Sequence, residues 1–290
     1  MSITQSPAEQ TTVERGAVIR HNNRRPALFI ARDDFIEALQ KRYLWLTLGY
    51  IELKRRYRRT ILGPFWAAGH IALYVVCVGF IFSSVLATDR ATYIPYLATS
   101  FVAWMLVYNT LQESSGAFVS ASSLRQQIPV PYFHFILLTL WRNILVHIHN
   151  YSLILIVSLF YGFKMTWFTT LLLIPGYILV MLNLLWLALL FATLAARYRD
   201  VTQLVAAIIQ VMVFVTPIFY SPDMLTKFQR IYVLTPNLLY HLTVVLRDPL
   251  LGKLPPVSSY YILVFTAIFG NLLAWWLFGK KRNQIIYWIM

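Results

Sequence analysis

Long uncharged, apolar runs alternate with short polar segments along most of the chain. Runs without Asp, Glu, Lys or Arg cover residues 60–88, 91–112, 143–163, 165–196, 201–222 and 254–279. Each exceeds the roughly 18 residues at which an apolar stretch becomes a candidate transmembrane helix. The runs are continuously apolar and do not alternate with polar residues, which excludes a transmembrane β-barrel. We therefore predict an all-α integral membrane protein with six transmembrane helices.

The expected spans lie within a transmembrane domain of residues 60–290. They cover approximately residues 63–87, 92–113, 135–161, 169–196, 201–221 and 257–279. Between the fifth and sixth spans, 16 uncharged residues, IYVLTPNLLYHLTVVL, separate Arg230 from Arg247. This stretch is shorter than the about 20 residues that a crossing requires, and Pro236 interrupts it. We predict a re-entrant outer hairpin within residues 222–256.

A hairpin of this kind restricts the class of membrane protein to which the chain can belong. Turn backbone at membrane depth is tolerated only where it is buried in protein or lines a water-filled cavity. The pattern therefore favours a conduit or a transporter subunit over a simple membrane anchor.

The N-terminal part of the chain is polar and basic. Residues 1–32 are expected to form a disordered cytoplasmic tail. In residues 33–59, apolar and aromatic positions recur at helical spacing among charged ones. We predict an amphipathic helix that lies in the lipid headgroup plane. The alternative is a soluble helix packed on a partner.

Composition and charge agree with a membrane location. The chain has 290 residues, of which 59% are hydrophobic and only 12% charged, whereas soluble domains have about 25% charged residues. Its net charge is +14. With six spans and the N-terminus inside, 19 Lys and Arg residues fall on the inner side and six on the outer side. This distribution predicts cytoplasmic termini and contact with membrane lipid, not with nucleic acid.

The inner loop at residues 117–134 is the longest of the inner connections. Pro129 and Pro131 prevent one straight helix from running through it into the third span. A short helix followed by a kink is typical of a docking element on the cytoplasmic surface. A passive connector is the alternative.

Few residues suit catalysis or cofactor binding. No span carries Asp or Glu at its centre, which argues against a proton or sodium relay. Gly279-Lys280 lacks the rest of a P-loop, so ATP is not expected to bind to this chain. His147 and His149 are two residues apart and point to different helix faces, so no metal site is predicted. Arg142, near the inner end of the third span, can either snorkel to the headgroups or pair, with Glu113 as one candidate partner.

Aromatic residues make up 16% of the chain. Aromatic faces pack on the apolar faces of sugar rings, and tyrosine adds a hydroxyl group. As a population they favour a carbohydrate or amphipathic substrate, although lipid anchoring explains any single one equally well.

Four sequence blocks resemble one family. LKRRYRRTILGPFW at residues 53–66 resembles the start of the first span in permease subunits of type-2 ABC exporters of polysaccharides, such as O-antigen, capsule and teichoic acid. ARYRDV at 196–201, TPIFY at 216–220 and TPN at 235–237 are similar to three further family blocks in the same order. The resemblance extends from about residue 33 to the C-terminus.

The resemblance implies a permease without its own enzymatic activity. Two copies would form a homodimer with two copies of a separate ATP-binding subunit, which would hold ATP and Mg. The substrate would be a lipid-linked (undecaprenyl-pyrophosphate) polysaccharide that crosses a bacterial inner membrane. Three alternatives stay open: a type-2 ABC exporter of drugs or small lipids, a membrane-embedded glycan-processing enzyme, and a channel or structural scaffold.

The resemblance also assigns three groups of site residues. Those expected at the inner interface and the lipid pyrophosphate are Arg55, Arg56, Tyr57, Arg58, Arg59 and Trp66. Those expected to couple to the ATP-binding subunit are Ser123, Arg125, Gln126, Gln127, Pro129, Pro131, Arg197, Arg199 and Asp200. Those expected at the outer gate are Thr216, Pro217, Phe219, Tyr220, Pro236 and Asn237.

Overall fold

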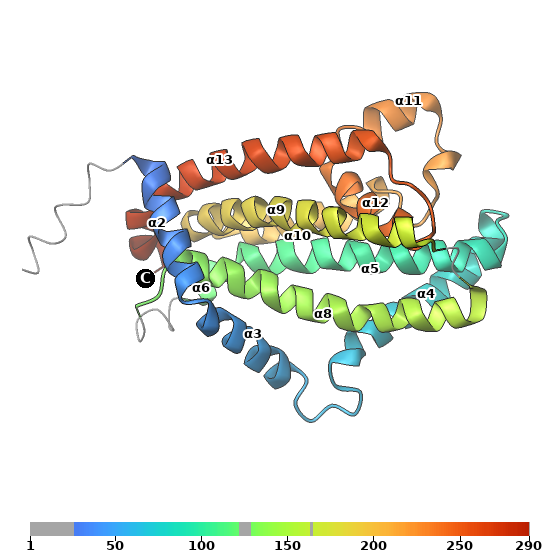
Figure 1. The fold of residues 1–290 in the computed structure, drawn as a ribbon, viewed down its shortest axis with the longest axis horizontal. Helices are drawn as coiled ribbons and strands as arrows, with labels where there is room; N and C mark the ends of the chain where they lie inside the picture. Colours follow the sequence, from blue (N-terminus) through green and yellow to red (C-terminus); the bar gives the residue numbers. More distant parts are fainter. Residues whose placement is uncertain (1–25, 122–128, 163–164, 290) are drawn as a thin grey trace, which may run out of the picture.

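The computed structural model describes residues 26–121, 129–162 and 165–289. Within these ranges the regular structure is entirely helical, and the helices form one elongated bundle (Figure 1). Five helical segments are long and apolar enough to cross a membrane. They are η1–α4 (Gly63–Val85, with α4 itself Trp66–Val85), α5 (Arg90–Ser115), α8 (Tyr132–Tyr161), α9 (Trp167–Arg197) and α13 (Val257–Ile289).

Five of the six predicted spans correspond to helices that are long and apolar enough to cross a membrane, whereas the helix at the predicted fifth span, residues 201–221, is shorter than expected. The corresponding helix, α10 (Asp200–Val215), has only 16 residues. Pro217 lacks an N–H group and disfavours helical geometry in the residue before it. Thr216 accordingly has ψ 133° and ends the helix. Residues 216–221 continue as irregular chain.

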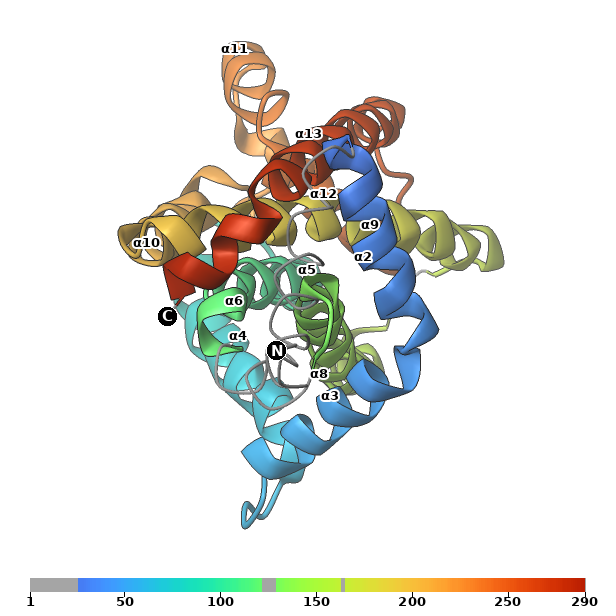
Figure 2. The ribbon, with the colours of Figure 1, turned by 90° about the vertical axis from the view of Figure 1, so that its left-hand side faces the viewer.

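α5 is the central helix of the bundle. In its most apolar window 72% of the residues are buried, compared with 22% for α4. α5 packs against α4, α8, α9, α10 and α12 (Leu238–Leu250). Viewed along the bundle, α4 and α10 lie on one side of it and α3 on another (Figure 2).

The end of the bundle that carries both described chain ends is termed the basic end. Here the predicted amphipathic helix at 33–59 is instead two helices, α2 (Ala27–Gln40) and α3 (Arg42–Arg56), with a break at Lys41. The two helices share α8 as a partner, but only α2 also packs on α13, whereas α3 also contacts η1. α2 also begins six residues before the expected boundary, where Ala27 approaches Gly279 so closely that no side chain would fit there.

Asp34 joins three helices at the basic end. Its side chain is fully buried, and Arg282 of α13 donates from Nε to Oδ1 at 2.7 Å. The backbone N–H of Phe133, in the first turn of α8, donates to Oδ2 at 2.9 Å. A carboxylate at a helix N-terminus is also favoured by the helix dipole.

The opposite end, termed the hairpin end, holds the segment predicted at 222–256. It contains η2 (Pro222–Met224), α11 (Lys227–Gln229), the π-helical turn η3 (Arg230–Leu234) and α12. α11 projects from the bundle, whereas α12 packs inside it (Figure 1). At the contact with α9, a Cβ atom on Gly176 would lie 2.9 Å from the carbonyl oxygen of Val245. Glycine therefore permits this close approach.

We predict that Asp34→Ala lowers the free energy of unfolding by about 3 kcal/mol, because it removes the buried acceptor of the Arg282 guanidinium and of the Phe133 N–H. Thermal unfolding in detergent provides the measurement. Glu37→Ala is the control on the same helix, since the Glu37–Lys41 pair is exposed and is worth little. Equal melting temperatures for the two variants would contradict the role given to Asp34.

Candidate functional site

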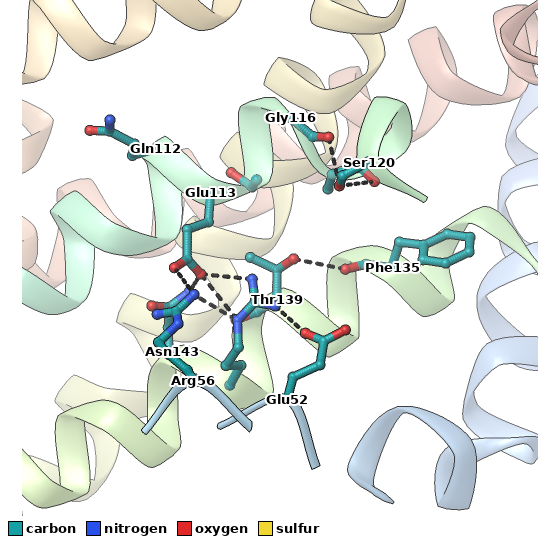
Figure 3. Close-up of polar contacts among 12 residues, drawn as sticks. Glu52, Arg56, Gln112, Glu113, Gly116, Ser120, Phe135, Thr139 and Asn143 are labelled. Carbon is teal, nitrogen blue, oxygen red and sulfur yellow. Dashed lines mark hydrogen bonds and ion pairs between the residues drawn. The ribbon is translucent and has the colours of Figure 1, made fainter. Parts of the chain in front are cut away.

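Five polar side chains form what we term the basic-end network, which joins α3, α5 and α8 (Figure 3). They are Glu52, Arg56, Glu113, Arg142 and Asn143. Glu113 Oε1 accepts from Arg56 Nη2 at 2.8 Å, and its Oε2 accepts from Arg142 Nη2 at 2.8 Å. Asn143 Nδ2 also donates to Glu113 Oε2, at 2.9 Å, and Arg142 pairs with Glu52 through Nη1.

The expected pairing of Arg142 with Glu113 is confirmed. Both side chains are largely covered, with exposed fractions of 16% and 22%. The participation of Glu52 was not predicted. Glu52 is 90 residues from Arg142 in the sequence, and its position within a predominantly basic helix gives no signal of this partner.

A cavity of about 670 Å³, termed the network cavity, opens beside these residues. Charged side chains meet on its wall, which includes Arg55, Arg56 and Arg142 together with the carboxylates of Glu52 and Glu113. The remainder of the wall is mostly apolar and comes from α3, α6 (Ala117–Ser120) and α8. Arginine forks bind phosphate oxygens in a bidentate manner, so this cavity can hold an anionic group.

A second cavity, of about 810 Å³ and termed the α4 cavity, lies under the first turns of α4. It shares Arg56 with the network cavity. Its other lining residues come from α4, α5, α8 and the connection between α3 and η1, and they are Tyr57, Trp66, Ala67, Gly69, His70, Ile71, Leu73, Met105, Tyr108, Asn109, Val146 and Asn150.

The structure brings only part of the predicted inner group together. Arg55 and Arg56 line the network cavity, and Tyr57 and Trp66 line the α4 cavity. Arg58 and Arg59 are exposed and line neither cavity. Arg59 has φ 69°, so it occupies the left-handed region as the chain turns away from α3.

Four of the nine residues expected to contact an ATP-binding subunit are exposed at the basic end. Arg197, Arg199 and Asp200 form the exposed corner between α9 and α10. Pro129 is exposed, whereas Pro131 is buried at the start of α8. Ser123, Arg125, Gln126 and Gln127 lie outside the described residues.

At the hairpin end, the irregular chain after α10 is held by side chains from other elements. Tyr93 Oη donates to the Phe219 carbonyl at 2.7 Å. Tyr96 Oη lies 2.7 Å from the carbonyls of both Pro217 and Tyr220. These bonds provide partners for carbonyls that no helix satisfies.

Arg247 of α12 completes this arrangement. It is 3% exposed, and its Nη1 donates to the Pro217 carbonyl at 2.9 Å and to Tyr96 Oη at 2.8 Å. Its Nε donates to Asp248 Oδ1 at 2.8 Å, which pairs the buried charge. Tyr93, Tyr96 and Arg247 were not predicted as site residues. Their partners are backbone atoms more than 25 residues away, which hydropathy does not show.

The predicted outer-gate residues lie together, and all but one of them are at least half-buried. Asn237 Nδ2 donates to Thr216 Oγ1 at 3.1 Å, and Asn237 Oδ1 caps α12 by accepting from the N–H of Leu239 at 3.0 Å. Thr216, Pro217 and Phe219 are buried, Tyr220 is half-buried, and Pro236 is exposed.

His241 fixes the start of α12 against α13. Burial lowers the pKa of its imidazole, so the neutral form predominates at neutral pH. The Thr235 carbonyl, 2.9 Å from Nε2, can only accept. Nε2 therefore carries the proton, and Nδ1 accepts from Ser259 Oγ at 2.9 Å.

A cavity of about 400 Å³ opens between these residues and the outer hairpin. Tyr96, Asp223, Arg230 and Asp248 are among the residues that line it. The hairpin end thus combines a rigid buried network with a polar recess.

Comparison with known proteins relates this architecture to transport. The family model for the ABC-2 type transporter matches residues 43–251. An O-antigen export system permease protein RfbA from Klebsiella pneumoniae is 24% identical over 237 residues, which cover 80% of this chain and 90% of that protein. One from Myxococcus xanthus is 23% identical over 185 residues, which cover 63% of this chain and 70% of that protein.

We predict that Arg247→Gln loosens the chain after α10. Hydrogen bonds to charged groups contribute about 1.5–3 kcal/mol, so amide hydrogen exchange in peptides covering residues 214–222 should become at least about tenfold faster. Arg230→Gln is the matched control, because Arg230 is half exposed and bonds within the hairpin itself. An unchanged exchange rate in Arg247→Gln would show that Arg247 does not hold residues 214–222 in place.

Proposed function

Because the chain belongs to the ABC-2 type transporter family, and is therefore a membrane transport subunit rather than an enzyme, we propose that it exports a lipid-linked polysaccharide such as O-antigen. The observation that carries this proposal is similarity to O-antigen export permeases over 80% of the chain. The substrate would be linked to undecaprenyl pyrophosphate. ATP and Mg would bind to a separate subunit, two copies of which would join a homodimer of this chain.

The basic end supports an anionic lipid headgroup as ligand. Arg55, Arg56 and Arg142 line one cavity there, and Arg56 also borders the α4 cavity. Arg58 and Arg59 are exposed immediately beyond α3 and add positive charge to this segment. Two adjoining phosphates present oxygens to several guanidinium groups at once, which suits this arrangement.

The exposed faces of two helices support a polar path. On α4 the exposed residues include His70, Tyr74, Cys77 and Ser84, whose spacing places them on one face together with the apolar Leu73 and Ile81. On α10 they include Gln203 and Gln210, seven residues apart. Every exposed residue is apolar in the central parts of the other long, partly exposed helices. These parts are residues 148–160 of α8, 171–182 of α9 and 264–276 of α13.

This contrast supports the homodimer. Polar side chains within spans generally face a protein interior or a water-filled cavity, not lipid. α4 and α10 lie on the same side of the bundle, and both pack on α5 (Figure 2). A second copy facing this side would enclose the polar faces and form a path for a glycan between the two chains.

The two ends would have different roles along this path. The buried residues around Thr216, Phe219 and Asn237 would form its outer gate. At the basic end, the exposed corner at 197–200 and the loop 117–134 would receive the ATP-binding subunit. This orientation would place the basic end in the cytoplasm of a bacterial cell and the hairpin end on the outer side of the inner membrane.

A type-2 ABC exporter of drugs or small lipids is the second candidate. The large basic cavity and the aromatic content favour the glycan, but stimulation of ATP hydrolysis distinguishes the two directly. Hydrolysis stimulated by a lipophilic drug and not by a lipid-linked glycan would establish this alternative. Turnover of a lipid-linked sugar without ATP would instead indicate a glycan-processing enzyme.

In proteoliposomes with its ATP-binding partner, we expect the wild-type chain to show ATP hydrolysis stimulated by an undecaprenyl-pyrophosphate-linked glycan. Arg56→Ala should weaken this stimulation about tenfold, because it removes a charge-assisted contact to phosphate. Lys54→Ala is the control, since Lys54 is exposed and lines neither cavity. Equal stimulation in all three proteins would refute the headgroup role.

Cys77, the single cysteine, tests the polar path. In the assembled transporter we expect a charged, membrane-impermeant thiosulfonate to modify it, because a thiolate forms in water and not in lipid. The control is Leu155→Cys in a Cys77→Ser background, which places the thiol on the apolar exposed face of α8. Comparable labelling at both positions, or labelling at neither, would contradict a hydrated path along α4.

A further inference from the structure

The α4 cavity has the composition of a binding site for a small polar ring. Its volume of about 810 Å³ falls within the range of roughly 300–1,000 Å³ typical of small-molecule sites. Ile71, Met105 and Val146 provide apolar wall, while Tyr108, Asn109 and Asn150 bring polar groups from α5 and α8. This mixture of apolar wall and few polar groups is what fixes the orientation of a bound molecule.

Asn150 gives the strongest indication that something binds there. It is 2% exposed, and its Oδ1 has no hydrogen-bond partner among the described residues. Asn143 lies seven residues earlier on the same face of α8, and its amide donates both to Glu113 and to the Thr139 carbonyl. A buried polar atom without a partner calls for an explanation, and a ligand in the cavity that Asn150 lines supplies one.

The mouth of the cavity suits a phosphate and a sugar. Arg56 borders it, and the ion pair with Glu113 engages only one nitrogen of a guanidinium group that has five N–H donors. Trp66 also lines the cavity and is 55% exposed, so its ring is accessible for packing against the apolar face of a sugar. A ring placed against Trp66 and within reach of Asn150 would leave its phosphate near Arg56.

We propose that the α4 cavity binds the lipid-proximal sugar of the substrate, with Asn150 hydrogen-bonding the sugar and Arg56 contacting the phosphate that links it to the lipid. This proposal rests on the proposed function. It adds that the permease recognises the first sugar, and not only the phosphate, before transport begins. The headgroup of an ordinary anionic phospholipid is the competing source of a phosphate-linked polar group.

Native mass spectrometry of the full-length chain in detergent tests this directly. Three probes are compared: undecaprenyl pyrophosphate that carries one N-acetylglucosamine, undecaprenyl pyrophosphate without sugar, and phosphatidylglycerol. We expect the wild-type chain to bind the sugar-bearing probe most tightly. Asn150→Leu should weaken that binding about tenfold and leave the sugar-free probe unaffected, because only the hydrogen bond to the sugar is lost.

Two further variants keep the test decisive if Asn150→Leu does not fold. Trp66→Leu should also weaken binding of the sugar-bearing probe alone, and its position at an exposed site makes folding defects small. Asn271→Leu is the matched control: its Oδ1 also lacks a partner among the described residues, but it lies on α13 away from the cavity. Its affinities should equal those of the wild type.

The remaining outcomes separate the two proposals. Equal affinity for the sugar-bearing and sugar-free probes, unchanged in Asn150→Leu and Trp66→Leu, would overturn the sugar site and leave the lipid-linked substrate standing. Tightest binding of phosphatidylglycerol would assign the cavity to phospholipid and overturn it as well. Binding of neither undecaprenyl probe by the wild type would instead contradict the proposed function itself.

Discussion

The carbonyl groups of Pro217, Phe219 and Tyr220 impose the constraint on which the hairpin end depends. Pro217 stops α10 short of a full crossing, so these carbonyls lie where no helix supplies a donor. Inside a bundle surrounded by lipid they need donors from the protein. Tyr93, Tyr96 and Arg247 provide them, and this requirement fixes how α5, α12 and the irregular chain lie together.

The basic end meets the same constraint with different chemistry. There the polar groups are side chains that pair with one another, as Arg56 and Arg142 do with Glu113. Bonds to backbone carbonyls cannot be exchanged without disrupting the chain, whereas a phosphate can replace a carboxylate as the partner of an arginine. In the proposed transporter, substrate binding would therefore loosen α3 at the basic end while the hairpin end keeps its arrangement.

The hydropathy pattern predicted those features of the fold that depend on local composition and on the spacing of apolar residues. The five long helices and the interrupted segment between the last two predicted spans follow from apolar runs and from Pro236. The end of α10 at Val215 was missed, because the apolar run continues through Pro217 to residue 222. Pairings between distant residues do not, because any of many charges could have met Asp34, and its partner Arg282 lies 248 residues away. Arg142 and Glu113 were predictable because both lie near the same end of neighbouring spans. Tyr96 gave no signal, since tyrosine near the end of a span is common at membrane interfaces.

α4 connects the proposed recognition site with the proposed path. It is the least buried of the five long helices, with 22% of its window covered, although it carries polar residues on its exposed face. His70 belongs to both features, because it lines the α4 cavity and is also the first residue of that polar face. A sugar released from the cavity would next meet Tyr74 and then Ser84 along the same side of the helix. Recognition and passage would thus be consecutive events on one helix, which a lipid-exposed monomer could not support and a second copy would complete.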